Sequence, residues 1–348
     1  MLLSNFIEFI VDKHVTKFAK TRYKSKVALL FVFVGVISVK LGKLFLRLFY
    51  EIKRAVVRKP FIAEVDITDS CNLRCCHCYH FKDKAMSNKK TEREEPSLEE
   101  WRKRFYELKR KGIRMIMLMG GEPMLRPDVV ELADRMFPFV ETITNGTIRI
   151  PEDYDHRVFV SIDGMERTND TIRGEGVFEK VIKNFAGDRR VVFNMTLAEE
   201  NYKELGKVVE LSEKVGAAGV VCNIYTSLSK NDPQAVKGDV RKKIIEELRR
   251  VKKLKPGTFL ITESAIKWFE KGDHREKCYW RDEVLHFDVN WMARHCFASA
   301  DCSNCGCFAG AMGHPFNSLK HIFGLAGILV GRVFEKIKMK RFNSRKYD

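Results

Sequence analysis

The stretch FIAEVDITDSCNLRCCHCY, residues 61–79, joins an apolar run to a tight group of cysteines. Its first eight residues have the composition of a buried strand, and Cys71, Cys75 and Cys78 follow with C-x3-C-x2-C spacing. Cys76 falls outside that spacing and is interpreted as a bystander. Cysteines grouped this tightly in a chain of 348 residues more often hold metal in a reducing compartment than form disulfides. The stretch therefore predicts a metal centre at the end of a strand.

The spacing of the three cysteines also limits the kind of metal centre. Three thiolates on a four-iron cluster leave one iron without a protein ligand, where a substrate or cofactor can bind, whereas fully ligated clusters use four. Zinc is the alternative, with His77 or His80 as the fourth ligand. Structural zinc sites usually pair two C-x2-C knuckles across a longer gap, so the spacing favours an iron–sulfur cluster.

Strand-like and helix-like patterns alternate through residues 61–258. The runs that read as strands cover residues 61–68, 113–119, 139–144, 157–163, 190–197 and 218–225. The amphipathic patterns that read as helices cover residues 97–112, 128–137, 176–187, 202–216 and 239–254. A repeated strand-then-helix order implies a parallel sheet. We therefore predict an α/β fold, a partial (β/α)6 TIM-like barrel, with a small cysteine-rich C-terminal extension and apolar, basic terminal helices.

Polar and glycine-rich motifs follow several of these strands. The cysteine group follows the first strand, GGEP (120–123) the second, TNG (144–146) the third and DG (163–164) the fourth, while Asn194 lies inside the fifth. Because the carboxyl ends of parallel strands meet at one rim, these motifs are expected to lie together. The sequence therefore predicts a cofactor site at that rim.

These motifs, in this order, resemble the radical S-adenosylmethionine (radical SAM) superfamily. The resemblance is carried by CNLRCCHCY after the first strand, GGEP after the second, and SIDG with TNDTIRGEGVFEKVI after the fourth. It covers residues 61–227 and, more loosely, residues 278–310, where it is to members with a SPASM/twitch-like extension. It leaves both ends of the chain outside.

The resemblance implies a set of cofactor contacts. In such enzymes the three cysteines of the C-x3-C-x2-C motif hold a 4Fe-4S cluster, whose open iron binds the amino and carboxylate groups of S-adenosylmethionine (SAM). Gly120, Gly121 and Glu122 match the motif that meets the methionine amino group. The residues implied to lie near the ribose, the methionine carboxylate or the adenine are Ser161, Asp163, Arg173, Asn194 and His77.

The resemblance also implies an activity. Such enzymes cleave SAM reductively to a 5′-deoxyadenosyl radical, which abstracts hydrogen from a substrate, so no catalytic acid–base pair is expected beyond the cluster. The cofactor carries the difficult chemistry, while the protein positions the reacting carbon and excludes water. A low-potential electron donor, similar to flavodoxin or ferredoxin, is the expected partner.

A second cysteine group lies in the C-terminal extension. The resemblance implies an auxiliary iron–sulfur cluster there, a second 4Fe-4S cluster held by Cys278, Cys296, Cys302 and Cys305, with Cys307 as a spare. HFDVNWMARHC, residues 286–296, resembles the family's hairpin before the second ligand, although Trp291 replaces the usual glycine. Zinc is again the alternative. Cys222, alone on the sixth strand, is interpreted as a small buried hydrophobic residue.

The charge of +17 is concentrated at the two ends of the chain. Residues 1–60 hold 13 Lys and Arg against 3 Asp and Glu, residues 319–348 hold 8 against 2, and the middle holds 42 against 41. Each end also has an apolar run, residues 27–39 and residues 322–334. A bilayer core needs about 20 apolar residues, so these runs favour helices lying on an anionic membrane surface over spans, with core packing as the alternative. We expect a peripheral or monotopic protein on the cytoplasmic side of a membrane.

These patterns divide the chain into four predicted parts. They are membrane-associating N-terminal helices over residues 1–60, the radical SAM partial barrel over 61–258, the auxiliary-cluster extension over 259–310, and an apolar, basic C-terminal helix and tail over 311–348.

Two functions within the radical SAM class agree with this organisation. The first is a membrane-associated enzyme that acts on a lipid or other apolar substrate. The alternative is a SPASM-like enzyme that matures a peptide or a cofactor. A non-catalytic metal- or RNA-binding protein is disfavoured, and no nucleic-acid partner is expected, because the middle of the chain is nearly neutral.

Overall fold

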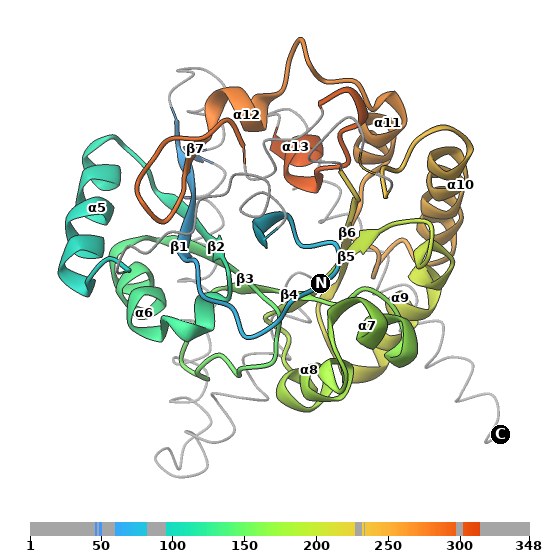
Figure 1. The fold of residues 1–348 in the computed structure, drawn as a ribbon, viewed down its shortest axis with the longest axis horizontal. Coiled ribbons are helices and arrows are strands. Elements are labelled where there is room, and N and C mark those ends of the chain that lie inside the picture. The colour runs from blue at the N-terminus through green and yellow to red at the C-terminus, as the bar shows by residue number, and fades with distance from the viewer. Residues whose placement is uncertain are drawn as a thin grey trace, which may run out of the picture. The chain divides into compact units, whose positions relative to one another are not determined.

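The computed structural model describes residues 46, 49–50, 60–81, 95–226, 232, 234–296 and 302–313. Within this part of the chain, seven strands form one sheet in the order β6-β5-β4-β3-β2-β1-β7, and every neighbouring pair is parallel (Figure 1). The strands are β1 (Ile62–Thr68), β2 (Met115–Gly120), β3 (Phe139–Thr144), β4 (Arg157–Ser161), β5 (Val191–Leu197), β6 (Gly219–Ile224) and β7 (Leu285–Phe287). The predicted α/β fold with an open, barrel-like parallel sheet is confirmed.

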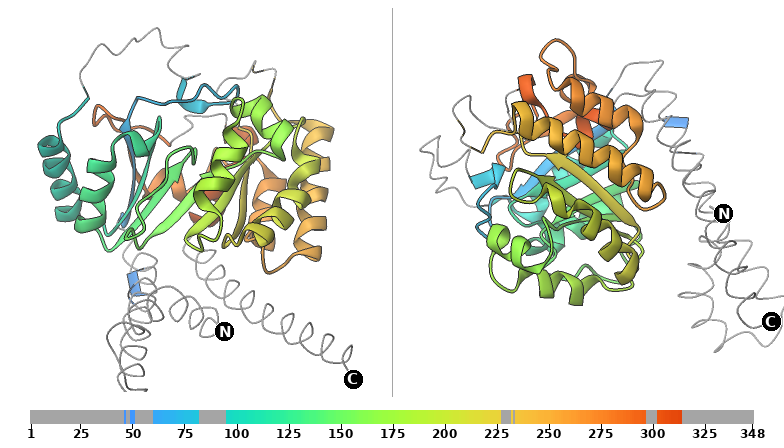
Figure 2. Two further views of the ribbon diagram at one scale, coloured as in Figure 1. Left: turned by 90° about the horizontal axis from the view of Figure 1, so that it is seen from below. Right: turned by 90° about the vertical axis from the view of Figure 1, so that its right-hand side faces the viewer.

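The outer face of the curved sheet is covered by helices (Figures 1 and 2). Those between the strands are α5 (Leu98–Arg110), α6 (Pro127–Met136), α7 (Glu166–Arg173), α8 (Val177–Phe185), α9 (Leu205–Val215) and α10 (Gly238–Leu254). All but α7 were predicted. The sequence of α7, ERTNDTIR, has Ile172 as its single apolar residue, so no apolar periodicity marks it as a helix.

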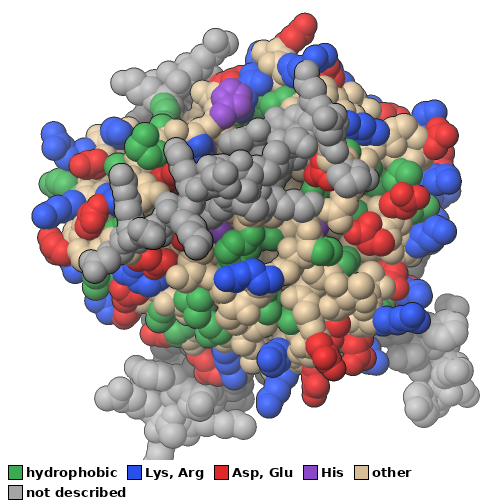
Figure 3. Space-filling view, viewed as in Figure 1, with side chains coloured by type: hydrophobic (Ala, Val, Ile, Leu, Met, Phe, Trp, Pro, Cys, Tyr) green, Lys and Arg blue, Asp and Glu red, His purple; other side chains and the backbone are tan. Residues whose placement is uncertain are grey.

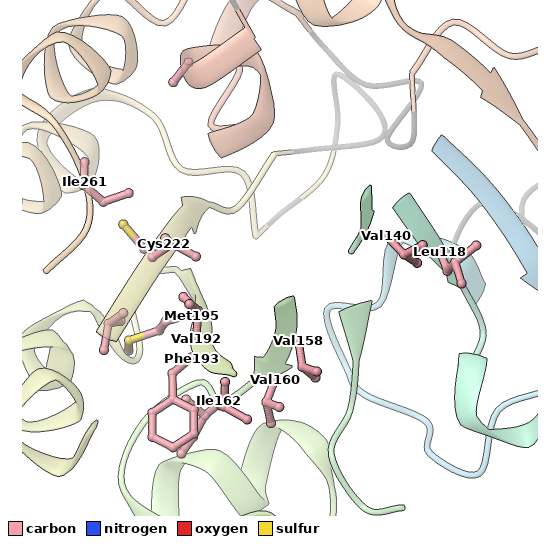
Figure 4. Close-up of a cluster of buried hydrophobic side chains, with 14 of the residues drawn as sticks. Leu118, Val140, Val158, Val160, Ile162, Val192, Phe193, Met195, Cys222 and Ile261 are labelled. Carbon is pink, nitrogen blue, oxygen red and sulfur yellow. The ribbon is translucent and has the colours of Figure 1, made fainter. Parts of the chain in front are cut away.

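The core lies on both faces of the sheet, as expected for parallel strands covered on each side. All seven residues of β1 are buried, and Trp101 and Phe105 of α5 are fully buried. Figure 4 shows part of this core, with side chains from β2 through β6. Cys222 is completely buried among them, and burial raises the pKa of its thiol, so its predicted role as a buried apolar residue is confirmed.

The C-terminal extension contacts both edges of the sheet. It contains α11 (Glu263–Lys271), α12 (Tyr279–Glu283), β7, a short 3-10 helix at Cys302–Asn304 and α13 (Phe308–Gly313). At one edge, β7 pairs with β1. At the other, Ile224 N donates to Gly306 O at 2.9 Å and Phe308 N donates to the Asn223 side chain at 2.8 Å. The extension therefore bridges the gap between the two edge strands (Figure 1).

The seventh strand was not predicted. Its three residues are too few to show a period, and it lies in the segment expected to form a hairpin. A short hairpin is present, because Phe287 bridges Ala293 in antiparallel fashion and Arg294 N donates to His286 O at 3.0 Å. The first arm of this hairpin is the strand that extends the sheet beyond β1.

Residues 58–317 form one compact unit. On the visible face of the described part, basic and acidic side chains are interspersed (Figure 3). Among the described residues, no helix is both long enough and apolar enough to cross a bilayer. The apolar runs at residues 27–39 and 322–334 lie outside the described residues. The predicted four-part division and the membrane association remain predictions.

Candidate functional site

The loop after β1 holds the first cysteine group. Cys71, Cys75 and Cys78 are half-buried, whereas Cys76 is exposed. Burial raises the pKa of Cys71, and it raises the pKa of Cys75 to about 11, with further increases from the charges of the neighbouring cysteines. Cys78 contributes to the raised pKa of both Cys71 and Cys75, so the three sulfurs lie near one another, and a bound metal would hold them as thiolates.

Hydrogen-bond donors surround two of these sulfurs. The Cys71 sulfur lies 3.4 Å from Leu73 N and 3.8 Å from Asn145 Nδ2, and the Cys75 sulfur lies 3.9 Å from Arg173 Nη1. Donors of this kind stabilise cluster thiolates and tune their clusters. The residues present therefore fit the predicted 4Fe-4S cluster. In the described ranges, no group of three His, Cys, Asp or Glu side chains is placed so that it could hold a single metal ion.

Gly120 and Gly121 join the end of β2 to the cysteine loop. Gly121 N donates to Thr68 O and Glu122 N donates to Ser70 O, both at 2.8 Å. A Cβ atom on Gly120 would lie 2.4 Å from Thr68 O, and one on Gly121 would lie 2.1 Å from Ser70 O. The close backbone approach predicted for these glycines is therefore made to the protein's own cysteine loop. Their predicted contact with the methionine amino group remains a prediction.

Glu122 connects β2 to the end of β3. Its fully buried carboxylate accepts hydrogen bonds from Met124 N at 2.9 Å, Thr144 Oγ1 at 2.7 Å and Asn145 N at 2.7 Å. Burial raises the pKa of Glu122, although these hydrogen bonds oppose the rise. Glu122 thus holds the backbone N–H of Asn145, and the side chain of the same residue reaches the Cys71 sulfur, a predicted cluster ligand.

Asp163 brings three predicted site residues together. Its fully buried carboxylate lies 2.6 Å from Arg173 Nη2 and 3.1 Å from His77 Nε2, and it accepts a hydrogen bond from Thr196 N at 2.7 Å. Burial alone would raise the pKa of Asp163, but Arg173 and His77 outweigh burial and hold it at about 2. Burial likewise opposes the charged form of His77, but Asp163 raises the pKa of His77 to about 9.

Arg173 lies at the end of α7, where its side chain is nearly buried. Its Nη2 pairs with Asp163 and its Nη1 faces Cys75, while its buried Nε has no hydrogen-bond partner among the described residues. Arg173 therefore links the fourth strand's motif to the cysteine loop and retains one free donor.

Ser161 and Asn194 face each other in the register of β4 and β5. Asn194 Oδ1 accepts a hydrogen bond from Asn223 Nδ2 at 3.0 Å, so a polar row runs across β4, β5 and β6. Sequence analysis did not single out Asn223. The polar side chain inside the apolar run VVCNIY was the available signal. Asn145 was noted only as part of TNG, and its contact with Cys71 required the fold.

The C-terminal cysteines also lie near one another. Burial raises the pKa of Cys305 to about 12, with further increases from Cys278, Cys302 and Cys296, so the four predicted ligands share one neighbourhood. Cys307 belongs to it too, because Cys305 and Cys296 add to the effect of burial on the Cys307 pKa. The Cys307 sulfur accepts a hydrogen bond from Gly310 N at 3.3 Å. The structure thus gathers five sulfurs where a four-ligand site was predicted.

Comparison with known proteins adds a family to this geometry. Residues 65–212 match the model of the Radical SAM superfamily. The chain is 32% identical over 180 residues to the AdoMet-dependent heme synthase of Methanosarcina barkeri, covering 47% of this chain and 50% of that protein. It is 32% identical over 173 residues to the sporulation killing factor maturation protein SkfB of Bacillus subtilis, covering 45% of this chain and 41% of SkfB. The chain thus spans half the length, or less, of these curated relatives.

The fold has solved counterparts. The structure of Streptococcus suis SuiB bound to S-adenosylmethionine superimposes with a TM-score of 0.53 at 12% identity, covering 85% of this chain and 72% of SuiB. Identity this low supports the fold alone. Together with the family match and the order of motifs along the strands, it leads to one conclusion. Residues 65–212 of this chain form a domain of the radical SAM superfamily.

Proposed function

We propose that this chain is a radical SAM enzyme that holds a 4Fe-4S cluster through Cys71, Cys75 and Cys78 and binds SAM at the carboxyl ends of the strands. When bound, these cofactors supply a 5′-deoxyadenosyl radical that abstracts hydrogen from a substrate. The observation that carries the proposal is the joining of the cysteine loop to the ends of β2 and β3 and to the end of α7. Gly121, Asn145 and Arg173, from three different motifs, each contact this loop or one of its sulfurs.

Arg173 is proposed as the anchor for the SAM carboxylate. Asp163 fixes the guanidinium through its contact with Nη2, and the Nε–H, which has no partner among the described residues, remains available to an anion. A carboxylate accepts charge-assisted hydrogen bonds from such a group. Ser161 and Asn194, one strand apart in register, are proposed as ribose contacts, and His77 as the side chain near adenine.

We propose a second iron–sulfur cluster at the C-terminal cysteines. The grouping of Cys278, Cys296, Cys302, Cys305 and Cys307 supports it. A metal bound there would displace the thiol protons and offset the repulsion between neighbouring thiolates. A low-potential electron donor is required for reduction of the first cluster.

For the substrate, we propose a peptide or a cofactor precursor. The relatives named above are a heme synthase and a peptide maturation protein, and this favours the maturation alternative over the lipid substrate. The lipid hypothesis rests on the apolar and basic ends of the chain, which lie outside the described residues. A lipid substrate would therefore overturn the proposed substrate class.

The activity is tested by anaerobic reconstitution followed by reduction with dithionite in the presence of SAM. We expect 5′-deoxyadenosine to form in the parent and in Cys76→Ala, and to be absent in the triple variant Cys71→Ala/Cys75→Ala/Cys78→Ala. Formation in the triple variant would show that the wrong cysteines were assigned. For the substrate, peptide, tetrapyrrole and lipid fractions are incubated separately with the enzyme, and new masses are sought. A new product confined to the lipid fraction would overturn the proposed substrate class.

A further inference from the structure

Two carboxylates on β1 are buried in the interior of the curved sheet. Glu64 and Asp66 are two residues apart, so they lie on the same face of the strand, and they are 1% and 2% exposed. Buried carboxylates are costly unless they are paired with opposite charge and hydrogen-bonded. Their partners therefore indicate which segments must be in place.

Those partners come from the C-terminal hairpin. The Arg294 guanidinium forms a bidentate pair with Asp66, in which Nη1 donates to Oδ2 and Nη2 donates to Oδ1 at 2.8 Å. Its Nη2 also lies 3.5 Å from Glu64 Oε1. His286, opposite Glu64 in the pairing of β7 with β1, lies 3.4 Å from the same carboxylate. Trp280 Nε1 donates to Glu64 at 3.1 Å.

Asp66 is also contacted by a residue beside the first cysteine group. His80, two residues after Cys78, lies 3.7 Å from Asp66 through Nδ1 and 3.2 Å from Asp69 through Nε2. Arg294 is two residues before Cys296. One buried acidic pair is therefore held by a residue next to each of the two cysteine groups.

We propose that Arg294, which is paired with Asp66 and Glu64, is a positioning residue that places Cys296 among the C-terminal thiols as a metal ligand. The hairpin brings Arg294 over β1, and the bidentate pair fixes the direction in which the chain leaves toward Cys296. Cys307, in contrast, is placed by α13 and by Arg241, which donates to Asn304 O at 3.0 Å and Cys305 O at 2.7 Å. The inference supports Cys296 as one of the ligands, and it rests on the proposed second cluster.

The test uses the full chain with Cys71, Cys75 and Cys78 replaced by alanine, so that iron reports only the C-terminal cysteines. In this parent, Arg294→Gln and Arg294→Lys are each expected to weaken iron retention against a chelator about tenfold or more. Lysine is not expected to rescue, because it cannot form the planar two-armed contact. The electron paramagnetic resonance spectrum of the remaining reduced iron should match that of Cys296→Ser, and Arg294→Gln/Cys296→Ser should be no worse than either single variant.

Arg104 provides a matched control. It lies on α5 and donates to Val289 O in the same hairpin at 2.8 Å, but it does not reach the carboxylates of β1. Arg104→Gln should keep the parent's iron retention and spectrum. The double variant Asp66→Asn/Arg294→Gln removes the carboxylate that Arg294→Gln alone leaves without its two-armed partner, while Glu64 keeps His286 and Trp280. Its melting temperature without metal should therefore recover part of the way toward the parent's while its iron retention stays low.

Each outcome separates this inference from the proposed cluster. If the parent binds no iron, the proposed C-terminal cluster fails, and this inference fails with it. If the parent binds iron and Arg294→Gln retains it equally well, the cluster stands and the positioning role is overturned. Recovery of both stability and iron in the double variant, or loss of iron in Cys307→Ser but not in Cys296→Ser, would also overturn it.

Discussion

Asp163 is the residue on which the arrangement of His77 and Arg173 depends. Its carboxylate is fully buried and carries the charge that balances the buried Arg173 guanidinium. Removing one partner of a buried ion pair leaves an uncompensated charge, whereas an exposed pair is worth little. The two kinds of pair can be compared within this chain.

Asp163→Asn is expected to lower the free energy of unfolding by about 3–5 kcal/mol, because it leaves Arg173 buried without its counter-charge. Urea unfolding of the metal-free protein under reducing conditions measures this change. Asp128→Asn is the control, since Asp128 is partly exposed and pairs with Arg126 at 3.0 Å, and its loss should cost about 0–1 kcal/mol. Equal losses in the two variants would contradict the role given to Asp163.

Trp291 is the only non-glycine residue with a positive φ, 62°, among the described residues, and it lies at the position where the resemblance predicts a glycine. Its ring stacks on Phe287 with centroids 4.3 Å apart and meets Trp101 edge to face. The aromatic contacts beside β7 are therefore expected to offset the backbone strain at Trp291.

Replacing Trp291 should separate strain from packing. Trp291→Gly loses the packing but relieves the left-handed strain of roughly 1–2 kcal/mol, whereas Trp291→Ala loses the packing and keeps the strain. The melting temperature should therefore fall in the order parent, Trp291→Gly, Trp291→Ala. A glycine variant more stable than the parent would mean that the aromatic contacts do not offset the strain.

At the scale of elements, the junction of β2 with the cysteine loop is the most constrained. The two backbone hydrogen bonds across it require glycine at positions 120 and 121, because a Cβ atom would overlap backbone carbonyl oxygens. The same junction places the loop that holds the first cysteine group. A change there should affect metal binding and stability together.

Gly121→Ala is expected to destabilise the metal-free protein by about 1–3 kcal/mol or more and to reduce iron bound at the first cysteine group. Iron analysis and thermal unfolding measure the two effects. Gly206→Ala, in α9, is the matched control, since its added methyl group meets the flexible end of Arg250 at 3.1 Å and Val251 at an ordinary contact distance of 3.8 Å, and alanine favours the helix. Normal iron content in Gly121→Ala would contradict the importance of this junction.

The sequence predicted six strands and five helices because their apolar periodicity and their flanking turn residues agree. It did not predict α7, whose polar composition has no apolar periodicity, although α7 carries Arg173. It grouped Asp163, Arg173 and His77 by resemblance, but not the ion pairs among them, because contacts between residues as far apart as 77 and 163 depend on the fold. The carboxylates of β1 gave no signal, since Glu64 and Asp66 read as ordinary breaks in an apolar strand.

At the scale of the whole molecule, charge is distributed unevenly along the chain. The nearly neutral middle of the sequence corresponds to a described surface on which both signs are interspersed (Figure 3), while the ends carry the excess of Lys and Arg. Clusters of basic residues beside apolar runs bind anionic lipid surfaces by a screened attraction. The ends are therefore expected to determine where the enzyme works, and the domain between them to determine its chemistry.

Sedimentation with vesicles tests this expectation. The full chain should bind vesicles that contain phosphatidylglycerol and bind neutral phosphatidylcholine vesicles more weakly. It should also lose part of its binding as salt is raised from about 0.05 to about 0.5 M, because the Debye length falls from above roughly 10 Å to below roughly 5 Å over this range. Replacing the five basic residues Lys336, Lys338, Lys340, Arg341 and Arg345 with glutamine should weaken binding. Equal binding to neutral and anionic vesicles at every salt concentration would contradict the prediction.

The central claim is that the loop after β1 holds a cluster with one iron open to SAM. The most direct measurement is the electron paramagnetic resonance spectrum of the reduced, anaerobically reconstituted protein, recorded with and without SAM. The account predicts that SAM changes the spectrum of the parent and of Cys76→Ala, and leaves that of Cys71→Ala/Cys75→Ala/Cys78→Ala unchanged. A spectrum indifferent to SAM in the parent, or a change that persists in the triple variant, would contradict it.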